Sequence, residues 1–273
     1  HVNLSGPDYY LGTVKMALDL GENCFMFYTG APQNTVRKEI SESKTLEALK
    51  LMEENGIDIN KVIVHAPYIV NLANPDEEKN KFAVSFLKNE LERCKKLHIK
   101  YLVLHPGSHV GSGVELGLNN IINSINKVLD DIDGVTILIE TMAGKGNEIG
   151  SKFEELKEII KQVENKNLVG VCLDTCHVSD AGYDIKDPSA TLKIFDDIVA
   201  LKYLKVMHIN DSLNDKGAHK DRHANIGQGK IGLKTLQAWV NYPLLSKICK
   251  ILETPWSING PIYKKEIHML LGK

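Results

Sequence analysis

The pattern of hydrophobic and polar positions along the chain shows short apolar runs separated by longer amphipathic stretches. Seven runs, rich in aliphatic and β-branched residues, cover residues 24–28, 62–64, 101–104, 135–139, 169–173, 204–207 and 248–252. Each run is too short for a helix and too uniformly apolar for a strand with one face in water, so it predicts a strand buried on both faces of a parallel sheet. Residues 1–3 read as the end of an eighth strand, and we expect a few further residues of that strand to precede His1.

The stretches between the runs predict helices. Residues 43–52 and 151–160 each combine a capping signal or charged residues with apolar positions at helical spacing. Alternating strands and helices indicate either an open doubly wound sheet or a closed barrel, and eight strands favour the (β/α)8 TIM barrel. A length of 273 residues suits that fold, and no linker interrupts the sequence. We therefore expect a single TIM-barrel catalytic domain over residues 1–273.

Composition narrows the function without defining it. A formal net charge of −2 argues against a protein that coats nucleic acid through a broad basic surface, although bound cations would reverse the charge of a local cleft. The five cysteines are scattered and form no C-x-x-C pair, which favours a reducing cytosol, and we expect a cytoplasmic protein of the bacterial type. The sequence contains no apolar stretch as long as a membrane span, so we expect no membrane partner.

Side chains of the types that bind divalent metals stand directly after six of the runs. They are His65, His105, Glu140, Asp174, His208 and Glu253, and successive members are 40, 35, 34, 34 and 45 residues apart. Each interval corresponds to about one βα unit, and the carboxyl ends of the strands of a TIM barrel converge on one mouth. Three further candidates, His177, Asp221 and His223, follow in the loops just beyond. The sequence therefore predicts nine metal-binding side chains at the mouth.

Taken one at a time, each of these histidines is explained more simply as a hydrogen-bonded barrel residue than as a ligand. Their joint placement favours metal binding, because four carboxylates gathered in one mouth would repel one another without cations. Nine ligands of the His, Asp and Glu types suit two or three ions, with Zn²⁺ favoured and Mn²⁺ or Fe²⁺ also accepted. Cys176, which lies between two candidates, is a weaker alternative ligand.

Longer motifs surround these residues. They are LHPGSH at 104–109, IETMAGKG at 139–146, VCLDTCH at 171–177, AGYD at 181–184, MHIND at 207–211, DRH at 221–223, IGQG at 226–229 and ILETP at 251–255. In combination they make the chain resemble the endonuclease IV family of abasic-site endonucleases (AP endonuclease family 2), and the resemblance runs along the whole chain. H-P-G or D-x-H alone would be weak evidence.

The resemblance implies a TIM barrel with three Zn²⁺ ions, Mn²⁺ or Fe²⁺ being possible at one or more sites. The implied division of ligands gives the first ion His65 and His105, the second Asp174, His208 and Glu253, and the third His177, Asp221 and His223, with Glu140 as the bridge between the first two. Glu140 and Glu253 are then the expected catalytic carboxylates. No protein nucleophile is needed, because metal ions supply the activation that phosphodiester hydrolysis requires.

The resemblance also implies the reaction. Members of the family hydrolyse the phosphodiester on the 5′ side of an abasic site and leave a 3′-hydroxyl and a 5′-deoxyribose phosphate, which is a step of base-excision DNA repair. Removal of 3′-blocking groups is implied as a second phosphodiesterase activity. We therefore expect a monomeric enzyme whose partner is double-stranded DNA with abasic sites or 3′-blocked ends.

Three side chains are candidate DNA contacts. Tyr68 matches a family aromatic that stacks at the lesion, although a rim tyrosine packed on the next loop would look the same in the sequence. Arg222 would reach a phosphate or else pair with a nearby carboxylate. Some family members insert an arginine from the loop after the second strand into the DNA stack, but here Gln33 falls nearest to that position and Arg37 comes later.

The main alternative is a metal-dependent sugar isomerase or epimerase on the same barrel. Such an enzyme needs an acid/base pair around one or two ions, and it would leave His177, Asp221 and His223 without a task. A non-catalytic metal-binding or DNA-binding barrel forms a third class. The size of the predicted ligand set favours the nuclease over both.

Overall fold

The computed structural model describes residues 1–2 and 8–273. Its main sheet consists of β1 (Phe25–Phe27), β2 (Val62–His65), β3 (Tyr101–Leu104), β4 (Thr136–Glu140), β5 (Val169–Asp174), β6 (Leu204–His208) and β9 (Cys249–Ile251). Strand order in the sheet follows chain order, and neighbouring strands run parallel. Each strand lies at one of the seven predicted runs, so the sequence pattern located all of them.

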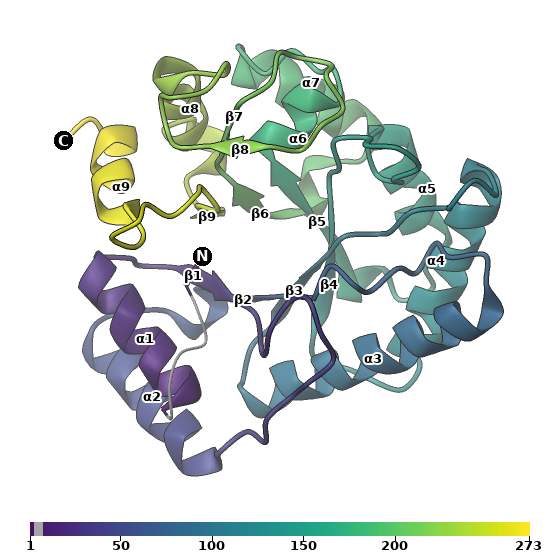
Figure 1. Ribbon diagram of the computed structural model, residues 1–273, viewed down its shortest axis with the longest axis horizontal. Coiled ribbons are helices and arrows are strands. Elements are labelled where there is room, and N and C mark those ends of the chain that lie inside the picture. The colour runs from purple at the N-terminus through teal and green to yellow at the C-terminus, as the bar shows by residue number, and fades with distance from the viewer. Residues whose placement is uncertain (3–7) are drawn as a thin grey trace.

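Residues 1–2 lie between the two edges of this sheet. The Val2 N–H donates a hydrogen bond to the Met26 carbonyl at 2.9 Å, and the His1 amino group donates to the Leu252 carbonyl at 2.6 Å. The segment thus joins β1 to the end of β9 and brings the sheet close to a full ring (Figure 1). The two described residues form no assigned strand, because one hydrogen bond to each neighbour is too little for a ladder, and Asn3 of the predicted strand lies outside the described residues.

Helices surround the sheet (Figure 1). They are α1 (Tyr9–Leu20), α2 (Glu42–Glu54), α3 (Glu77–Lys96), α4 (Val114–Leu129), α5 (Phe153–Gln162), α6 (Thr175–Asp180), α7 (Pro188–Ile198), α8 (Leu233–Val240) and α9 (Tyr263–Leu271). Single 3-10 turns, at Ile59–Lys61, Lys166–Leu168, Leu201–Tyr203 and Pro243–Leu245, precede four of the strands. The two helices predicted at 43–52 and 151–160 are α2 and α5, and the prediction of a TIM barrel is confirmed.

Local capping explains where several helices begin. The Ser41 hydroxyl accepts the Lys44 N–H at the start of α2, and the Asp76 carboxylate accepts the Lys79 N–H at the start of α3. A short hairpin of β7 (Asp211–Ser212) and β8 (His223–Ala224) lies outside the main sheet, in the segment between β6 and α8. Within the described residues, no helix has the length and apolar character needed to cross a membrane.

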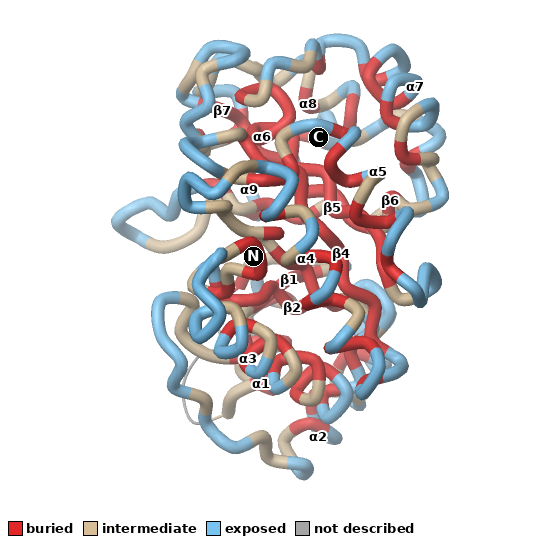
Figure 2. The backbone as a smooth tube through the Cα atoms, turned by 90° about the vertical axis from the view of Figure 1, so that its right-hand side faces the viewer, coloured by how far each residue is buried: buried red, intermediate tan, exposed pale blue. Residues whose placement is uncertain are grey.

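The buried residues gather along the centre of the molecule (Figure 2), and their side chains form two layers. The larger layer lies between the sheet and the helices. The smaller layer fills the inside of the barrel with one side chain from each strand, namely Met26, Ile63, Val103, Leu138, Cys172, Val206 and Ile251. Because this apolar layer closes the barrel interior, a functional site with room for ligands must lie beyond it, at an end of the strands.

Candidate metal centre

The alternation of strand side chains places the predicted ligands above the apolar layer. Side chains two residues apart on a strand point to the same side. Each of the six strand-end ligands stands two positions after an interior residue, as His65 follows Ile63 and Glu140 follows Leu138. The same spacing holds for His105, Asp174, His208 and Glu253. All six therefore project into the mouth at the carboxyl ends of the strands.

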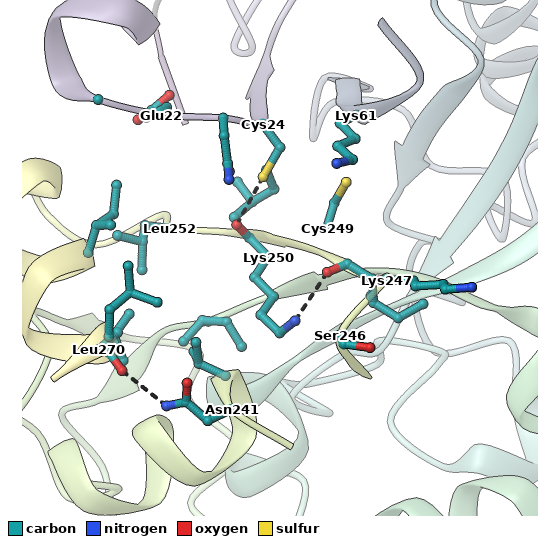
Figure 3. Close-up of a pocket in the computed structure, with 18 of the residues that line it drawn as sticks. Glu22, Cys24, Lys61, Asn241, Ser246, Lys247, Cys249, Lys250, Leu252 and Leu270 are labelled. Atoms are coloured by element: carbon teal, nitrogen blue, oxygen red, sulfur yellow. Dashed lines mark hydrogen bonds between the residues drawn. The ribbon is translucent and has the colours of Figure 1, made fainter. Parts of the chain in front are cut away.

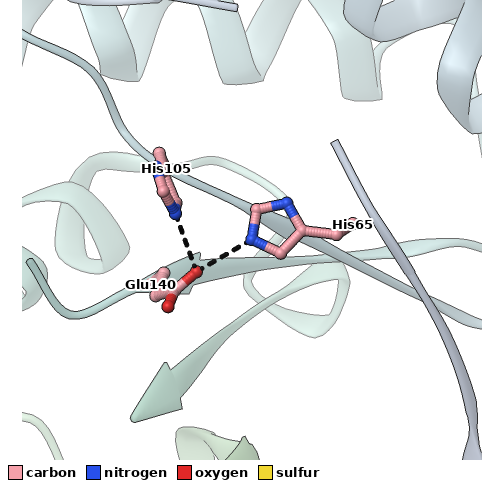
Figure 4. Close-up of side chains that lie close together, drawn as sticks. All are labelled: His65, His105 and Glu140. Atoms are coloured by element: carbon pink, nitrogen blue, oxygen red, sulfur yellow. Dashed lines mark hydrogen bonds and ion pairs between the residues drawn. The ribbon is translucent and has the colours of Figure 1, made fainter. Parts of the chain in front are cut away.

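The first ligand group consists of His65, His105 and Glu140 (Figure 4). Glu140 Oε2 lies 3.0 Å from His65 Nε2 and 3.2 Å from His105 Nε2. His65 Nδ1–H donates to the Ala66 carbonyl at 2.7 Å, which leaves Nε2 to face the carboxylate. Two atoms that each bind a tetrahedral Zn²⁺ at about 2.0–2.1 Å lie roughly 3.3 Å apart, so this spacing suits a shared metal ion.

The second group consists of Glu140, Asp174, His208 and Glu253. His208 Nδ1 lies 2.9 Å from Glu140 Oε1 and 2.9 Å from Glu253 Oε2, while Asp174 Oδ2 is 3.8 Å away. Glu140 therefore directs one carboxylate oxygen toward the first group and the other toward the second. A carboxylate in this position can bridge two cations, which is the arrangement of two-metal sites.

The third group consists of Asp174, His177 and His223, with Asp221 beside them. His177 Nδ1–H donates to the Thr141 carbonyl at 2.8 Å, and its Nε2 lies 2.9 Å from Asp221 Oδ1. His223 Nε2 is buried and has no hydrogen-bond partner, and it lies 3.6 Å from carboxylate oxygens of both Asp174 and Asp221. An unpartnered imidazole nitrogen facing two carboxylates is a donor set that fits a divalent metal.

The structure thus brings all nine predicted ligands together in three adjacent groups. Asp174 belongs to both the second and the third group, as Glu140 belongs to both the first and the second. The alternative ligand Cys176 is fully buried, and burial raises the pKa of its thiol, which disfavours the thiolate that metals bind. Among the described residues, no ligand group includes Cys176.

Without metal, the histidines and carboxylates of the site stabilise one another's charged forms. Burial alone would lower the pKa of His105, but the facing Glu140 outweighs it and raises the pKa. Burial opposes ionisation of Glu140 too, yet His208 and His105 hold the pKa of this carboxyl well below its usual range. His177 shows the same balance, its pKa being raised by Asp174 and Asp221 against the effect of burial. The cluster is built for positive charge, which metal ions supply more strongly than protons.

A cavity of about 400 Å³ opens over this centre, and aromatic side chains wall it beside the ligands. Tyr28, Trp256 and Tyr263 contribute the aromatic wall. The mouth therefore has a polar floor of candidate metal-binding side chains and partly apolar walls. Such a cavity suits a bound molecule that has both charged and apolar parts. Six of the nine ligands line the cavity, namely His65, His105, His177, Asp221, His223 and Glu253.

A separate cavity of about 690 Å³ lies between β1 and β9 (Figure 3). Cys24, Lys61 and Cys249, which line it, stand at the amino ends of their strands, away from the ligand mouth. Two of its polar side chains bond to the chain itself, as Cys24 Sγ donates to the Lys250 carbonyl at 3.5 Å and Lys250 Nζ donates to the Leu245 carbonyl at 2.6 Å, whereas Glu22 Oε2 is buried without a hydrogen-bond partner among the described residues. Features at this end of a TIM barrel serve stability rather than chemistry.

The three predicted DNA contacts lie at the surface. Tyr68 is 57% exposed, which favours a free aromatic over one packed on the next loop. Gln33 and Arg222 are also exposed, and within the described residues no carboxylate pairs with the Arg222 guanidinium. Arg37 is held inside the molecule, because its Nε donates to Glu90 Oε1 at 2.6 Å and its guanidinium lies over the Phe86 ring. Arg37 is therefore not available to enter DNA.

Three buried residues that the sequence did not single out position the ligands. Asn210 Nδ2 donates to Asp174 Oδ2 at 2.7 Å, and Asn210 Oδ1 accepts the Glu253 N–H at 2.8 Å. Thr141 supplies the carbonyl that orients His177, and its hydroxyl accepts the Asp174 N–H. Asn210 stands two residues after His208, so the alternation of side chains was the signal that could have found it.

Asp180, the third of these residues, organises the loop that carries Asp221 and His223. Its carboxylate is buried and accepts hydrogen bonds from the Ser212 hydroxyl, the Asn214 amide and the backbone N–H groups of Lys220 and Asp221. Asp221 has a positive φ of 56°, a conformation that is uncommon for residues other than glycine and that a hydrogen bond to its backbone constrains. The Asp180 carboxylate provides that constraint.

We expect Asp180→Ala to weaken metal binding at the third group while leaving the other two groups loaded. Loss of a residue that orients ligands typically weakens metal affinity by about 10- to 100-fold. Elemental analysis after dialysis against a weak chelator measures the effect, with Asp197→Ala on the outer face of α7 as the matched control. Equal metal content in the two variants would contradict the positioning role of Asp180.

Comparisons with known proteins agree with this geometry. Residues 14–272 match the family model described as the xylose isomerase-like TIM barrel. The chain is 52% identical over 273 residues to a probable endonuclease 4 of Acholeplasma laidlawii, covering 99% of this chain and 93% of the relative, and 47% identical over 280 residues to that of Bacillus subtilis, covering 100% and 94%.

Two solved structures superpose on this chain. Endonuclease IV from Thermus thermophilus superposes with a TM-score of 0.84 at 31% identity, over 98% of this chain and 95% of that one. A D-tagatose 3-epimerase-like protein superposes with a TM-score of 0.70 at 20% identity, over 93% and 90%. The second likeness shows a shared barrel only, whereas the first extends to the sequence.

Proposed function

Because the chain belongs to the endonuclease IV family within the xylose isomerase-like TIM barrels, we propose that it is a metal-dependent endonuclease of base-excision repair that cuts DNA at abasic sites. The observation that carries the proposal is the mouth in which two carboxylates, Glu140 and Asp174, each join two ligand groups. Such a continuous cluster suits the charge that develops on a phosphodiester during hydrolysis. The proposed cut lies on the 5′ side of the abasic deoxyribose and leaves a 3′-hydroxyl, with trimming of 3′-blocked ends as a second activity.

We assign the ligands in line with the three groups. His65 and His105 would hold the first ion, Asp174, His208 and Glu253 the second, and His177, Asp221 and His223 the third, with Glu140 between the first two and Asp174 also adjoining the third. The donor set of imidazoles and carboxylates favours Zn²⁺, and Mn²⁺ or Fe²⁺ fits the same atoms. When bound, the ions supply Lewis-acid stabilisation of the phosphate and activation of water near neutral pH.

The chain's own residues prepare the site for this chemistry. The carbonyls of Ala66 and Thr141 fix the tautomers of His65 and His177, so that Nε2 of each ring faces the centre. Glu140 is fully buried and hydrogen-bonded on both oxygens, which keeps it ionised and immobile. Glu253 is placed by its N–H bond to Asn210. Pre-set donors of this kind avoid reorganisation during the reaction.

The proposed substrate is a DNA duplex bound by one copy of the chain. Arg222 stands exposed between two ligands, in position to contact a phosphate, and Tyr68 is exposed on the loop that follows His65. An abasic position costs less to unstack than a normal base pair, so an aromatic at the rim gains access to it. The sugar isomerase or epimerase alternative has weaker support, because a D-tagatose 3-epimerase-like protein shares the barrel at only 20% identity and a D-psicose 3-epimerase at 18%.

We expect the purified protein, loaded with metal, to nick a duplex that contains one tetrahydrofuran abasic analogue and to leave the undamaged duplex intact. Denaturing gel electrophoresis of end-labelled strands identifies the cut and the chemistry of the new ends. A duplex that survives beside an active reference endonuclease would overturn the proposed function. Turnover of a ketose or aldose under the same conditions would support the epimerase alternative instead.

A further inference from the structure

The loop after β9 places an aromatic side chain at the rim of the metal centre. Trp256 stands three residues after the ligand Glu253 and lines the same cavity as the ligands. Its indole is 41% exposed, but its Nε1–H donates to the Tyr263 hydroxyl at 3.1 Å, and Tyr263 is buried. The ring is therefore held in a fixed place with an apolar surface open to the cavity.

The residues that follow form a rigid turn with an apolar tip. Ser257 and Gly260 exchange backbone hydrogen bonds of 2.9 and 3.0 Å, and the Ser257 hydroxyl donates to the Gly260 carbonyl at 2.8 Å. Gly260 has a φ of +106°, which only glycine adopts without strain. Ile258 at the tip is fully exposed. Ile258 makes no contribution to the core, so its whole side chain is free to contact a molecule bound at this rim of the cavity.

We propose that Trp256 and Ile258 form an apolar DNA-contact ridge, in which Trp256 packs on the deoxyribose or neighbouring base at the abasic site and Ile258 enters the base stack beside it. This inference rests on the proposed function. Apolar wedges are a common device for prying apart base steps, and a missing base exposes an apolar sugar face and leaves a gap in the stack.

Two observations favour damaged DNA as the occupant of the ridge. Trp256 shares its cavity with the ligands, so a substrate whose phosphate reaches the metal centre also passes the indole. The helix α9, which begins three residues after Gly260, carries Lys264 and Lys265 on its exposed surface, and cations beside an apolar ridge suit a phosphate backbone. Because Arg37 is bound to Glu90, it is not free to enter the base stack, and another residue must do so.

Tryptophan fluorescence tests the ridge directly, because the chain has two tryptophans and the other one, Trp239, is fully buried. The unmodified, metal-loaded enzyme is titrated with duplexes with and without one tetrahydrofuran site, and each duplex carries a non-hydrolysable phosphonate linkage at the position of the cut. We expect the abasic duplex to quench or shift the emission and the undamaged duplex to leave it nearly unchanged at the same concentration. The same titration on a Trp239→Phe background assigns the signal to Trp256.

Kinetics of variants in the active enzyme provide the second readout. Loss of one stacking aromatic weakens binding of nucleic acid by roughly 5- to 150-fold, so Trp256→Ala should raise KM for the abasic duplex by about tenfold with a smaller change in kcat. Trp256→Phe should restore most of the loss. Ile258→Ser should also raise KM, whereas Ile194→Ser, an exposed isoleucine on α7, should not.

The outcomes separate this proposal from the proposed function. In one outcome, the unmodified enzyme nicks the abasic duplex while Trp256→Ala keeps the same KM and the emission does not respond to DNA. That result would contradict the proposed DNA-contact ridge and leave the proposed function intact. If the unmodified enzyme fails to nick, both fall. Should Trp256→Ala fold poorly, the fluorescence of the chain with its native Trp256 still decides the question.

Discussion

Replacing Glu140 with glutamine is expected to remove nearly all DNA cleavage while the barrel stays folded. Glu140 is the carboxylate on which two ligand groups meet, since its Oε2 faces His65 and His105 and its Oε1 faces His208. Glutamine keeps the shape but loses the negative charge and one of the two acceptor oxygens. Loss of a single electrostatic contact at a reacting centre lowers kcat by about 10²- to 10³-fold, and a bridge between two ions should exceed that.

The measurement is kcat on the tetrahydrofuran duplex, with thermal unfolding as a check on the fold. Glu158→Gln is the matched control and should keep normal turnover, because Glu158 lies on α5 and accepts a hydrogen bond from the surface residue Gln162. Cleavage by Glu140→Gln within a few-fold of the unmodified enzyme would remove Glu140 from the bridging role.

Removing the metal is expected to abolish cleavage and to destabilise the fold. The emptied site leaves four carboxylates and five histidines in a small buried volume, and a ligand bound at 1,000 times its Kd contributes about 4 kcal/mol to stability. For a chain of this size that corresponds to a fall in Tm of roughly 10 °C. Activity and Tm are measured after prolonged chelation, and both should return when Zn²⁺ or Mn²⁺ is added back.

The difference in Tm between loaded and metal-free protein should widen as pH rises from about 6.5 to 8.5. In metal-free protein the pKa values of His105 and His177 are raised, so their pairing with carboxylates stabilises the fold fully below the ordinary histidine value near 6.5 and is lost as pH rises through the folded-state values. The stabilisation by bound metal changes in the opposite direction. Metal binding releases protons, so its affinity increases as pH rises. A constant difference across this range would contradict the exchange of protons for metal at these histidines.

Elemental analysis of the fully active enzyme decides the metal count. Three ligand groups predict three ions per chain. One ion per chain in protein at full activity would contradict the three-group assignment and would favour the one-metal chemistry of an isomerase-like barrel.

Sequence pattern and tertiary structure contributed differently to the DNA-facing surface. Tyr68 and Arg222 were recognisable as rim residues, and both are exposed. Nothing in the sequence separated Arg37 from a DNA contact, because its tie to Glu90 joins residues 53 positions apart. Trp256 could not be recognised from the sequence either, since its relation to the cavity depends on the turn of residues 257–260 and on its bond to Tyr263.

The sequence by itself determined the strands, the barrel and which side chains are the candidate ligands. Strand burial and the two-residue alternation are local properties, so the position of Glu140 after Leu138 already specified which way its side chain points. Only the tertiary structure decided how the candidate ligands are distributed among the three groups. The sharing of Glu140 and Asp174 between groups, and the hold of Asp180 on the Asp221 backbone, are contacts between distant segments whose distances arise when the sheet closes on itself.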